Sequence, residues 1–138
     1  MHRFLIVLTL GLAPLRAAPV DFAEEIRPLF NKHCVSCHGG VKKASGVSFI
    51  SRQEALAAAK SGERPIVPHQ PNQSELVKRI VSQDPDERMP PADHGPALAE
   101  AERELLTRWI AEGATWRNHW AYETPVRPEV PEAQDSDW

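Results

Sequence analysis

The chain has 138 residues, a formal net charge of −3 and only two cysteines. Two cysteines are far too few to build a disulfide scaffold, and a mildly acidic chain without a basic run is a poor candidate for binding nucleic acid. The length suits one domain with a single modest hydrophobic core.

The first residues have the pattern of a secretory signal peptide. A weakly basic start at Met1-His2-Arg3 is followed by an apolar run from Phe4 to Leu12 and by small residues at Ala17 and Ala18. The run is far shorter than the roughly 20 residues that a membrane-crossing helix needs, which disfavours an uncleaved membrane anchor. We predict that residues 1–17 are removed, that the protein is exported to the periplasm or an equivalent extracytoplasmic space, and that it keeps no stable membrane span. Loss of the leader's two arginines takes the net charge from −3 to −5.

A first helix is predicted from Asp21 to near His33. Asp21 and Glu24 have the spacing of a capping box. The apolar residues that follow with helical spacing are Phe22, Ile26, Leu29 and Phe30. Gly39 and Gly40 then interrupt the pattern, and residues 41–50 are expected to form a loop or short extended chain.

Three more helices are expected further along the chain. Ser51 and Glu54 form a second capping box before an alanine-rich helix that Gly62 ends. A short helix follows, with its apolar face at Leu76, Val77, Ile80 and Val81. After a polar loop at 82–97, a last helix runs from about Leu98 to Glu112, and Gly113 stops it. Its apolar face is Leu98, Leu105, Leu106, Trp109 and Ile110.

Beyond residue 117 the composition changes. Prolines stand at 125, 128 and 131, and the end is acidic with nothing to build a core. We therefore predict one folded domain over residues 18–117 and a Pro-rich acidic linker or tail over 118–138.

The two cysteines belong to one short motif, Cys34-Val35-Ser36-Cys37-His38. Covalent attachment of haem c needs two thiols that add to the two vinyl groups and a histidine that reaches the iron, and Cys-x-x-Cys-His is the pattern named for that use. A thioredoxin-like redox pair would follow a strand and begin a helix, whereas here a helix is expected to end at the motif. A structural zinc site needs four ligands, and the remaining histidines are scattered. The motif favours haem over a disulfide, a redox pair or zinc.

A haem iron bound by His38 has a sixth coordination position, for which Met89 is the candidate. A thioether ligand favours reduced iron and raises the reduction potential, which suits an electron carrier. Met89 is the one methionine left after the leader, and it lies in a polar loop before Pro90 and Pro91, which would stiffen the chain around it. The alternatives are a core-filling role for Met89 and ligation by His94 or His69.

Several stretches together resemble the planctomycete-type cytochrome c domain, a relative of class I cytochromes c. They are "VDFAEEIRPLF", "CVSCHGG", "IVPHQPNQSELVKRI", "DERMPP", "LLTRWIAEGATW" and "HWAYETPVRPEVP", spanning about residues 20–131. The resemblance implies that Cys34 and Cys37 carry the haem, that His38 is the proximal iron ligand and that Met89 is the distal one.

Three departures from the family's pattern stand out. The family usually has glycine where His69 stands, and its last helix commonly starts with a threonine-proline cap, whereas Ala99-Glu100 offers no capping side chain. Family members also continue past the proline-rich segment into much larger domains of large secreted proteins. A C-terminal enzyme domain absent from this chain is therefore kept open beside a free-standing carrier.

The expectation from the sequence is an all-α class I cytochrome c fold, with three to five helices around one covalently bound haem c. The expected function is that of an exported mono-haem electron carrier between redox proteins, with no catalysis of its own. Two alternatives remain. One is a haem-based sensor with an open or labile sixth position, and the other is a haem-free interaction module with a Cys34–Cys37 disulfide.

Overall fold

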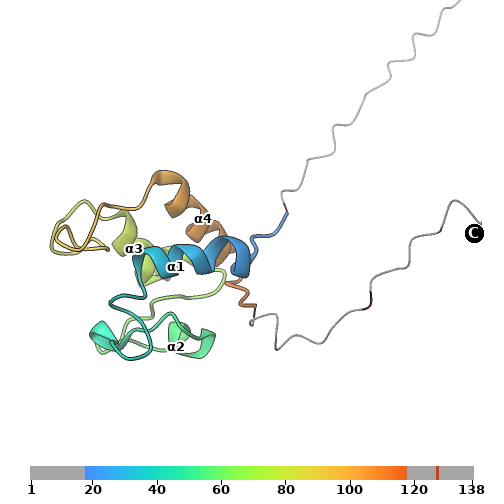
Figure 1. Cartoon of the computed structure of the whole chain (residues 1–138), viewed down its shortest axis with the longest axis horizontal. Helices are drawn as coiled ribbons and strands as arrows, with labels where there is room; N and C mark the ends of the chain where they lie inside the picture. Colours follow the sequence, from blue (N-terminus) through green and yellow to red (C-terminus); the bar gives the residue numbers. More distant parts are fainter. Residues whose placement is uncertain (1–17, 118–126, 128–138) are drawn as a thin grey trace, which may run out of the picture.

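The computed structural model describes residues 18–117 and residue 127, and within them all regular structure is helical. The four α-helices are α1 (Arg27–His33), α2 (Arg52–Leu56), α3 (Glu75–Val81) and α4 (Glu100–Ala111) (Figure 1). A π-helical turn over Phe22–Ile26 runs directly into α1, and 3-10 turns occupy Ala44–Gly46 and Pro71–Gln73. The predicted all-α class is confirmed for this part of the chain. The predicted signal peptide and, apart from residue 127, the predicted tail lie outside the described residues.

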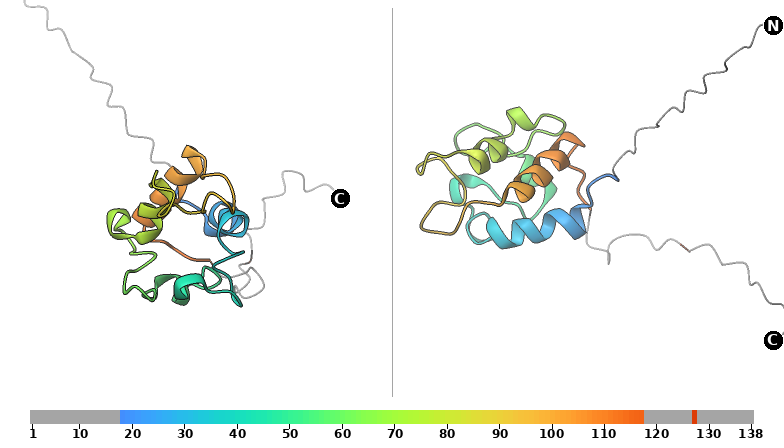
Figure 2. Two further views of the ribbon diagram at one scale, coloured as in Figure 1. Left: turned by 90° about the vertical axis from the view of Figure 1, so that its left-hand side faces the viewer. Right: turned by 90° about the horizontal axis from the view of Figure 1, so that it is seen from above.

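The helices fall into two groups. Helix α2 and the loops around it lie apart from α3 and α4, below α1 in the view of Figure 1, and the left-hand view of Figure 2 shows the same separation. Helix α4 packs against both α3 and the π-helical turn. The segment between α1 and α2, which begins with the Cys-x-x-Cys-His motif, therefore links the two groups.

The first helical segment begins where the sequence predicts, with a different capping partner. The Asp21 side chain accepts hydrogen bonds from the backbone N–H groups of Ala23 at 2.7 Å and Glu24 at 3.1 Å. The capping-box spacing predicts that the Glu24 carboxylate accepts from the Asp21 N–H. In the structure the Glu25 carboxylate accepts this bond instead, at 2.8 Å. The first turn is a π-helical one, with a wider repeat than an α-helix, and this places the reciprocal carboxylate one residue later.

An aromatic cluster forms the centre of the core. Phe22 stacks on Trp116 with ring centroids 4.0 Å apart, and Phe30 stacks on Phe49 at 4.7 Å. Trp109 lies 5.7 Å from both Phe22 and Phe30, and its indole N–H donates to the Thr115 carbonyl at 3.0 Å. Trp109 lies on the apolar face that the sequence predicts for the last helix, and the cluster fixes α1 against α4.

Helix α2 is shorter than the sequence predicts. The Ser51 hydroxyl caps it by accepting from the Glu54 N–H at 3.3 Å, but the helix ends at Leu56 and Ala57 is extended. The next residues are bonded elsewhere, because Ala59 N–H donates to Glu63 and Lys60 N–H donates to Ser45. These backbone bonds override the helical propensity of the alanines.

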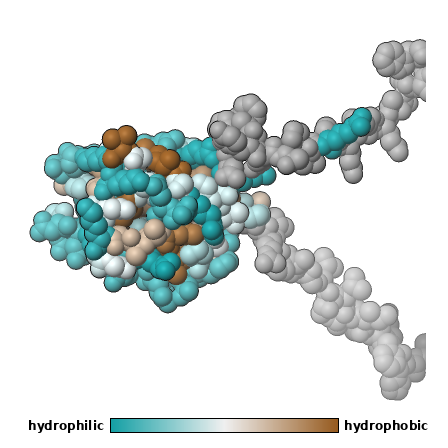
Figure 3. Space-filling model, turned by 90° about the horizontal axis from the view of Figure 1, so that it is seen from below, coloured by the Kyte–Doolittle hydropathy of each residue, from teal (hydrophilic) through white to brown (hydrophobic). Residues whose placement is uncertain are grey.

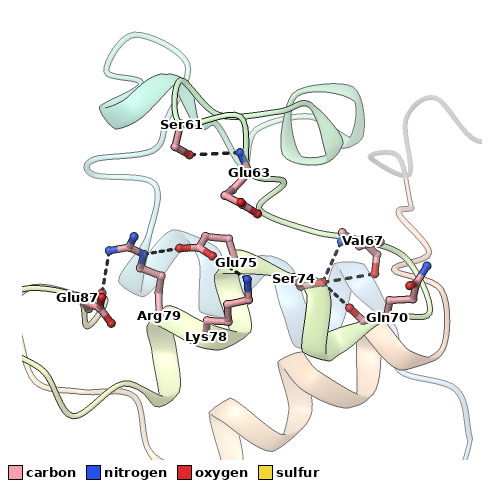
Figure 4. Close-up of polar contacts among 9 residues, drawn as sticks. All are labelled: Ser61, Glu63, Val67, Gln70, Ser74, Glu75, Lys78, Arg79 and Glu87. Carbon is pink, nitrogen blue, oxygen red and sulfur yellow. Dashed lines mark hydrogen bonds and ion pairs between the residues drawn. The ribbon is translucent and has the colours of Figure 1, made fainter.

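Helix α3 is positioned by a buried serine. Ser74 stands at its N-cap but makes no capping bond to the helix. Its hydroxyl instead accepts from the Val67 N–H at 2.9 Å and donates to the Gln70 carbonyl at 3.0 Å, as Figure 4 shows. The 67–70 turn is thereby bonded to the start of α3 through a side chain with no solvent exposure.

Val81 departs from its predicted place on the apolar face of α3. Leu76 and Ile80 are buried, whereas Val81 is 47% exposed, because it is the last residue of the helix. Val41 and Ile50 are the other large hydrophobic residues that are exposed in the described part of the chain. Figure 3 shows hydrophobic side chains reaching the surface between hydrophilic ones on one face of the molecule.

His69 adopts the left-handed backbone conformation that glycine adopts most easily, with a φ of 65°. Its N–H donates to the Ile110 carbonyl at 2.8 Å, and its ring nitrogen Nδ1 donates to the Ala111 carbonyl at 3.2 Å. The ring lies over Gly113, where an added Cβ would come within 2.5 Å of His69 Cε1. The histidine therefore adds to the end of α4 one side-chain bond that glycine would lack, at a backbone cost of about 1 kcal/mol.

Candidate cofactor-binding site

The motif residues form one hydrogen-bonded turn at the C-terminal end of α1. The N–H groups of Cys34 and Val35 both donate to the Phe30 carbonyl at 2.9 Å. The Cys34 carbonyl in turn accepts from Cys37 at 3.1 Å and from His38 at 2.8 Å. The structure thus places both cysteines and the histidine on one turn of backbone, and the predicted end of the first helix at this motif is confirmed.

Gly39 makes the tightness of this turn possible. A Cβ added there would lie 2.6 Å from the Val35 carbonyl oxygen, which is closer than real Cβ contacts come. Since the obstacle is backbone and not a flexible side chain, a larger residue would have to displace the turn. The glycine that follows the motif is therefore part of its geometry.

His38 is held by its backbone and by one aromatic neighbour. Its carbonyl accepts from the Phe49 N–H at 2.9 Å, and its ring meets the Phe49 ring edge-on at 5.7 Å. Burial lowers the pKa of the imidazole, which the backbone of Val47 and Ala44 partly offsets, so the neutral, metal-binding form is favoured. Within the described part of the chain, Nδ1 is buried without a hydrogen-bond partner. The ring therefore has bonding capacity that these residues do not use.

The two cysteines are both free thiols. Burial raises the pKa of the Cys34 thiol to about 12, and Cys34 packs against the hydrophobic core. Cys37 is approached by the Lys42 ammonium, with Nζ 3.8 Å from its sulfur. A redox-active cysteine pair needs a thiol with a lowered pKa, which is the opposite of what Cys34 has. The environment disfavours the redox-pair alternative.

Met89 lies in the loop between α3 and α4. It is partly buried, its N–H donates to the Arg79 carbonyl at 3.0 Å, and its peptide bond to Pro90 is cis. In the described residues no hydrogen bond joins Met89 to the motif. The structure therefore places the predicted distal ligand on a different element from the other three predicted site residues.

The competing histidines are engaged elsewhere. His94 is exposed beside Asp93, with its Nε2 3.7 Å from a carboxylate oxygen, and His69 closes the end of α4. His33 is bonded through Nε2 to Glu102 at 3.1 Å. None of these contacts joins the three histidines to the Cys34–His38 turn.

Glu102 is a residue that the sequence analysis missed. Its carboxylate accepts from Lys32 at 2.9 Å and from the Ala99 N–H at 2.9 Å, and it also bonds His33. The Lys32 ammonium, with help from the Ala99 N–H and His33, lowers the pKa of this carboxyl to about 2, although burial opposes the shift. Ala99 offers no capping side chain, as predicted, and a glutamate three residues after it was the signal for this half of a capping box. Glu102 thereby ties the residues just before the motif to the start of α4.

The donor set fits haem better than zinc. Among residues 18–117, no group of three or more His, Cys, Asp or Glu side chains is arranged to hold a metal ion, and a structural zinc site needs four such ligands. Covalent haem needs only two thiols and an axial nitrogen, which the Cys34–His38 turn supplies.

Among the described residues, no helix has the length and apolar character to cross a membrane.

Comparison with known proteins gave a match to a protein family. Residues 34–93 match the model of a family described as planctomycete cytochrome c, a range that includes the Cys34–His38 turn and Met89. The resemblance seen in the sequence is thereby confirmed over this range. No curated protein and no solved structure matched.

Proposed function

We propose that this chain, which over residues 34–93 carries a domain of the planctomycete cytochrome c family, is an exported mono-haem electron carrier. The observation that carries the proposal is the Cys34–His38 turn. It presents two free thiols and a partly buried imidazole with an unused ring nitrogen on one tight stretch of backbone.

Each site residue has a distinct role in this proposal. Cys34 and Cys37 would hold the haem through thioether bonds, and His38 would supply the proximal axial nitrogen. Met89 would supply the distal sulfur. Bound haem c supplies one-electron chemistry, and the protein sets its potential through the axial ligands and the polarity of the surroundings.

The aromatic core supports such a site. Phe30 and Phe49 stack on each other, and Phe49 also meets the His38 ring. These rings fix the imidazole plane and keep water from one side of it, which favours a constant geometry in both oxidation states. A site that does not rearrange suits electron transfer better than catalysis on a substrate.

The partners we propose are redox proteins of the extracytoplasmic space, or an enzyme domain joined to this one. Val41 and Lys42 lie just beyond the motif, after Gly39 and Gly40, and both are exposed. Lys43 is paired with Glu54, whereas the Lys42 ammonium lies 3.8 Å from the Cys37 sulfur, so Lys42 is the cation that we propose for contact with a partner's acidic surface beside the motif. The net negative charge of the chain disfavours nucleic acid as a partner.

The first experiment is a test of covalent attachment. Expression with cytochrome c maturation machinery should give one haem per chain that survives acid-acetone extraction and stains on a denaturing gel. Cys34→Ser and Cys37→Ser should each weaken retention, whereas Ser36→Ala, at the exposed position between them, should not. Haem that extracts fully from the wild type would contradict the proposal and favour the disulfide module.

The sensor alternative differs from the electron carrier in the sixth coordination position of the iron, which would be open or held by a labile ligand. A carrier with Met89 on the iron should bind carbon monoxide weakly in the reduced form, whereas a sensor with an open position should bind it readily. The measurement is a carbon monoxide titration of the reduced protein.

A further inference from the structure

Two arginine side chains hold the loop that carries Met89. Arg79 of α3 donates from Nη1 to the Glu87 carbonyl at 3.3 Å. Arg88 donates from Nη2 to the Gly95 carbonyl at 3.0 Å. The first bond ties the loop to α3, and the second closes the loop on itself across Met89.

Arg79 is itself fixed in place. Its Nε donates to the Glu75 carboxylate at 2.9 Å, one helical turn earlier, and Figure 4 shows its guanidinium between Glu75 and Glu87. Its backbone carbonyl also accepts from the Met89 N–H at 3.0 Å. Arg79 therefore contacts the loop twice, through the side chain at residue 87 and through the backbone at residue 89.

We propose that Arg79 and Arg88 are positioning residues that hold the Met89 sulfur in place for the haem iron. The inference rests on the proposed function, since it assumes that Met89 is the distal ligand. Residues 83–87 and 92–94 of the loop are exposed and residues 88–91 are only partly buried, so packing alone does not order the loop. Hydrogen bonds from the guanidinium groups of Arg79 and Arg88 restrict the loop, and this lowers the entropy that the methionine loses when it binds.

The alternative is that Arg79 only strengthens α3 through its ion pair with Glu75. Lys78 separates these two roles, because its ammonium pairs with the same carboxylate at 3.3 Å and, within the described residues, forms no bond to the loop. If the ion pair alone matters, loss of Lys78 should act like loss of Arg79. If the loop contact matters, only Arg79 should affect the ligand.

The test compares Arg79→Ala, Arg88→Ala and Lys78→Ala in the full-length haem-loaded protein. In the oxidised state, the near-infrared sulfur-to-iron band should weaken in both arginine variants. Imidazole, used as the competing ligand, should bind each of them about fivefold more tightly than the wild type, which corresponds to one net hydrogen bond. Amide hydrogen exchange at residues 87–89 should speed up by a similar factor. Lys78→Ala should match the wild type in all three measurements.

Arg79→Lys gives a further check that does not depend on the stability of the alanine variant. Lysine keeps the ion pair with Glu75 but has one ammonium for two acceptors, so its imidazole affinity should fall between those of the wild type and Arg79→Ala. If the wild type has the band and both arginine variants keep it with unchanged imidazole affinity, the positioning role is wrong, whereas ligation by Met89 still stands. A wild type without the band would overturn ligation by Met89, and the positioning role with it.

Discussion

Met89 is ordered mainly by hydrogen bonds of the chain around it, since its side chain is only partly buried. A neutral thioether stabilises ferrous iron relative to ferric iron, whereas an imidazole at the same position donates more strongly and favours ferric iron. The choice of residue at 89 should therefore set the reduction potential with little effect on the fold.

We expect Met89→His to lower the midpoint potential and to keep the iron six-coordinate. Met89→Ala should open the site to water or carbon monoxide while the haem stays covalently attached. Redox titration and near-infrared spectra of the oxidised protein measure both effects, and each variant should lose the sulfur-to-iron band. If Met89→Ala leaves the potential unchanged and the wild type has no such band, the sixth ligand is another group and the sensor alternative gains support.

Gly39 and Gly40, the two glycines after the motif, should respond differently to substitution by alanine, because the space around them differs. A Cβ at Gly39 would lie 2.6 Å from the Val35 carbonyl oxygen, whereas a Cβ at Gly40 would meet only Ile50 Cγ1, at 4.0 Å. Gly39→Ala should cost about 1–3 kcal/mol of unfolding free energy, as overpacking typically does. Gly40→Ala should change it by less than about 0.5 kcal/mol. Chemical denaturation of the two variants makes the comparison, and equal stability would show that the turn can shift freely.

At the scale of the helices, the sequence predicts the buried faces better than the ends. The apolar spacing correctly identifies Phe22, Ile26 and Phe30 on the first helix and Trp109 and Ile110 on the last. The ends depend on contacts between segments that local pattern does not contain, such as the bond from Lys60 N–H to Ser45 that accompanies the early end of α2.

At the candidate site, too, the sequence predicts local features but not contacts between distant segments. The Cys34–His38 motif and Met89 are visible in the sequence because their chemistry is local to a few residues. Glu102 and Arg79 act through residues that are distant in the chain or in a neighbouring loop, so only the structure shows what they contact.

Glu102 links the helices in a way that should depend on pH. Its pKa of about 2 in the folded protein lies below the ordinary value of 4.5, so its contribution to stability is complete above pH 4.5. That contribution should decline as the pH falls from 4.5 towards 2. Because the side chain is 19% exposed, we discount for solvent screening and expect about 1–2 kcal/mol at neutral pH.

Glu102→Gln measures this contribution directly. The variant should be less stable than the wild type by that amount at pH 7, and the difference should shrink towards zero at pH 2–3. Glu100→Gln is the matched control, because Glu100 is exposed in the same first turn of α4 and should show a much smaller effect. If the loss of unfolding free energy in Glu102→Gln does not change with pH, the side chain stabilises the fold through packing and not through its charge.

At the scale of the whole molecule, the two ends of the described domain are joined. The Val20 N–H donates to the Glu112 carboxylate at 2.7 Å, and Arg117 pairs with Asp21 at 3.0 Å. Trp116 also stacks on Phe22 at the start of the first helical segment. The residues just after α4 are therefore part of the core, and the domain boundary close to 117 stays a prediction.

Two truncations locate that boundary. A chain that ends at Arg117 keeps Trp116 and the contact with Asp21, so it should keep its haem spectrum and lose less than about 0.5 kcal/mol of stability. A chain that ends at Gly113 loses the buried Ala114 and the partly buried Trp116 ring, which together should cost about 3 kcal/mol or more. For a domain of this size, that cost should lower the melting temperature by well over 10 °C, while the first truncation should shift it by only a few degrees. A large fall for the chain that ends at Arg117 would place part of the fold in residues 118–138, and the predicted linker would then begin later than residue 118.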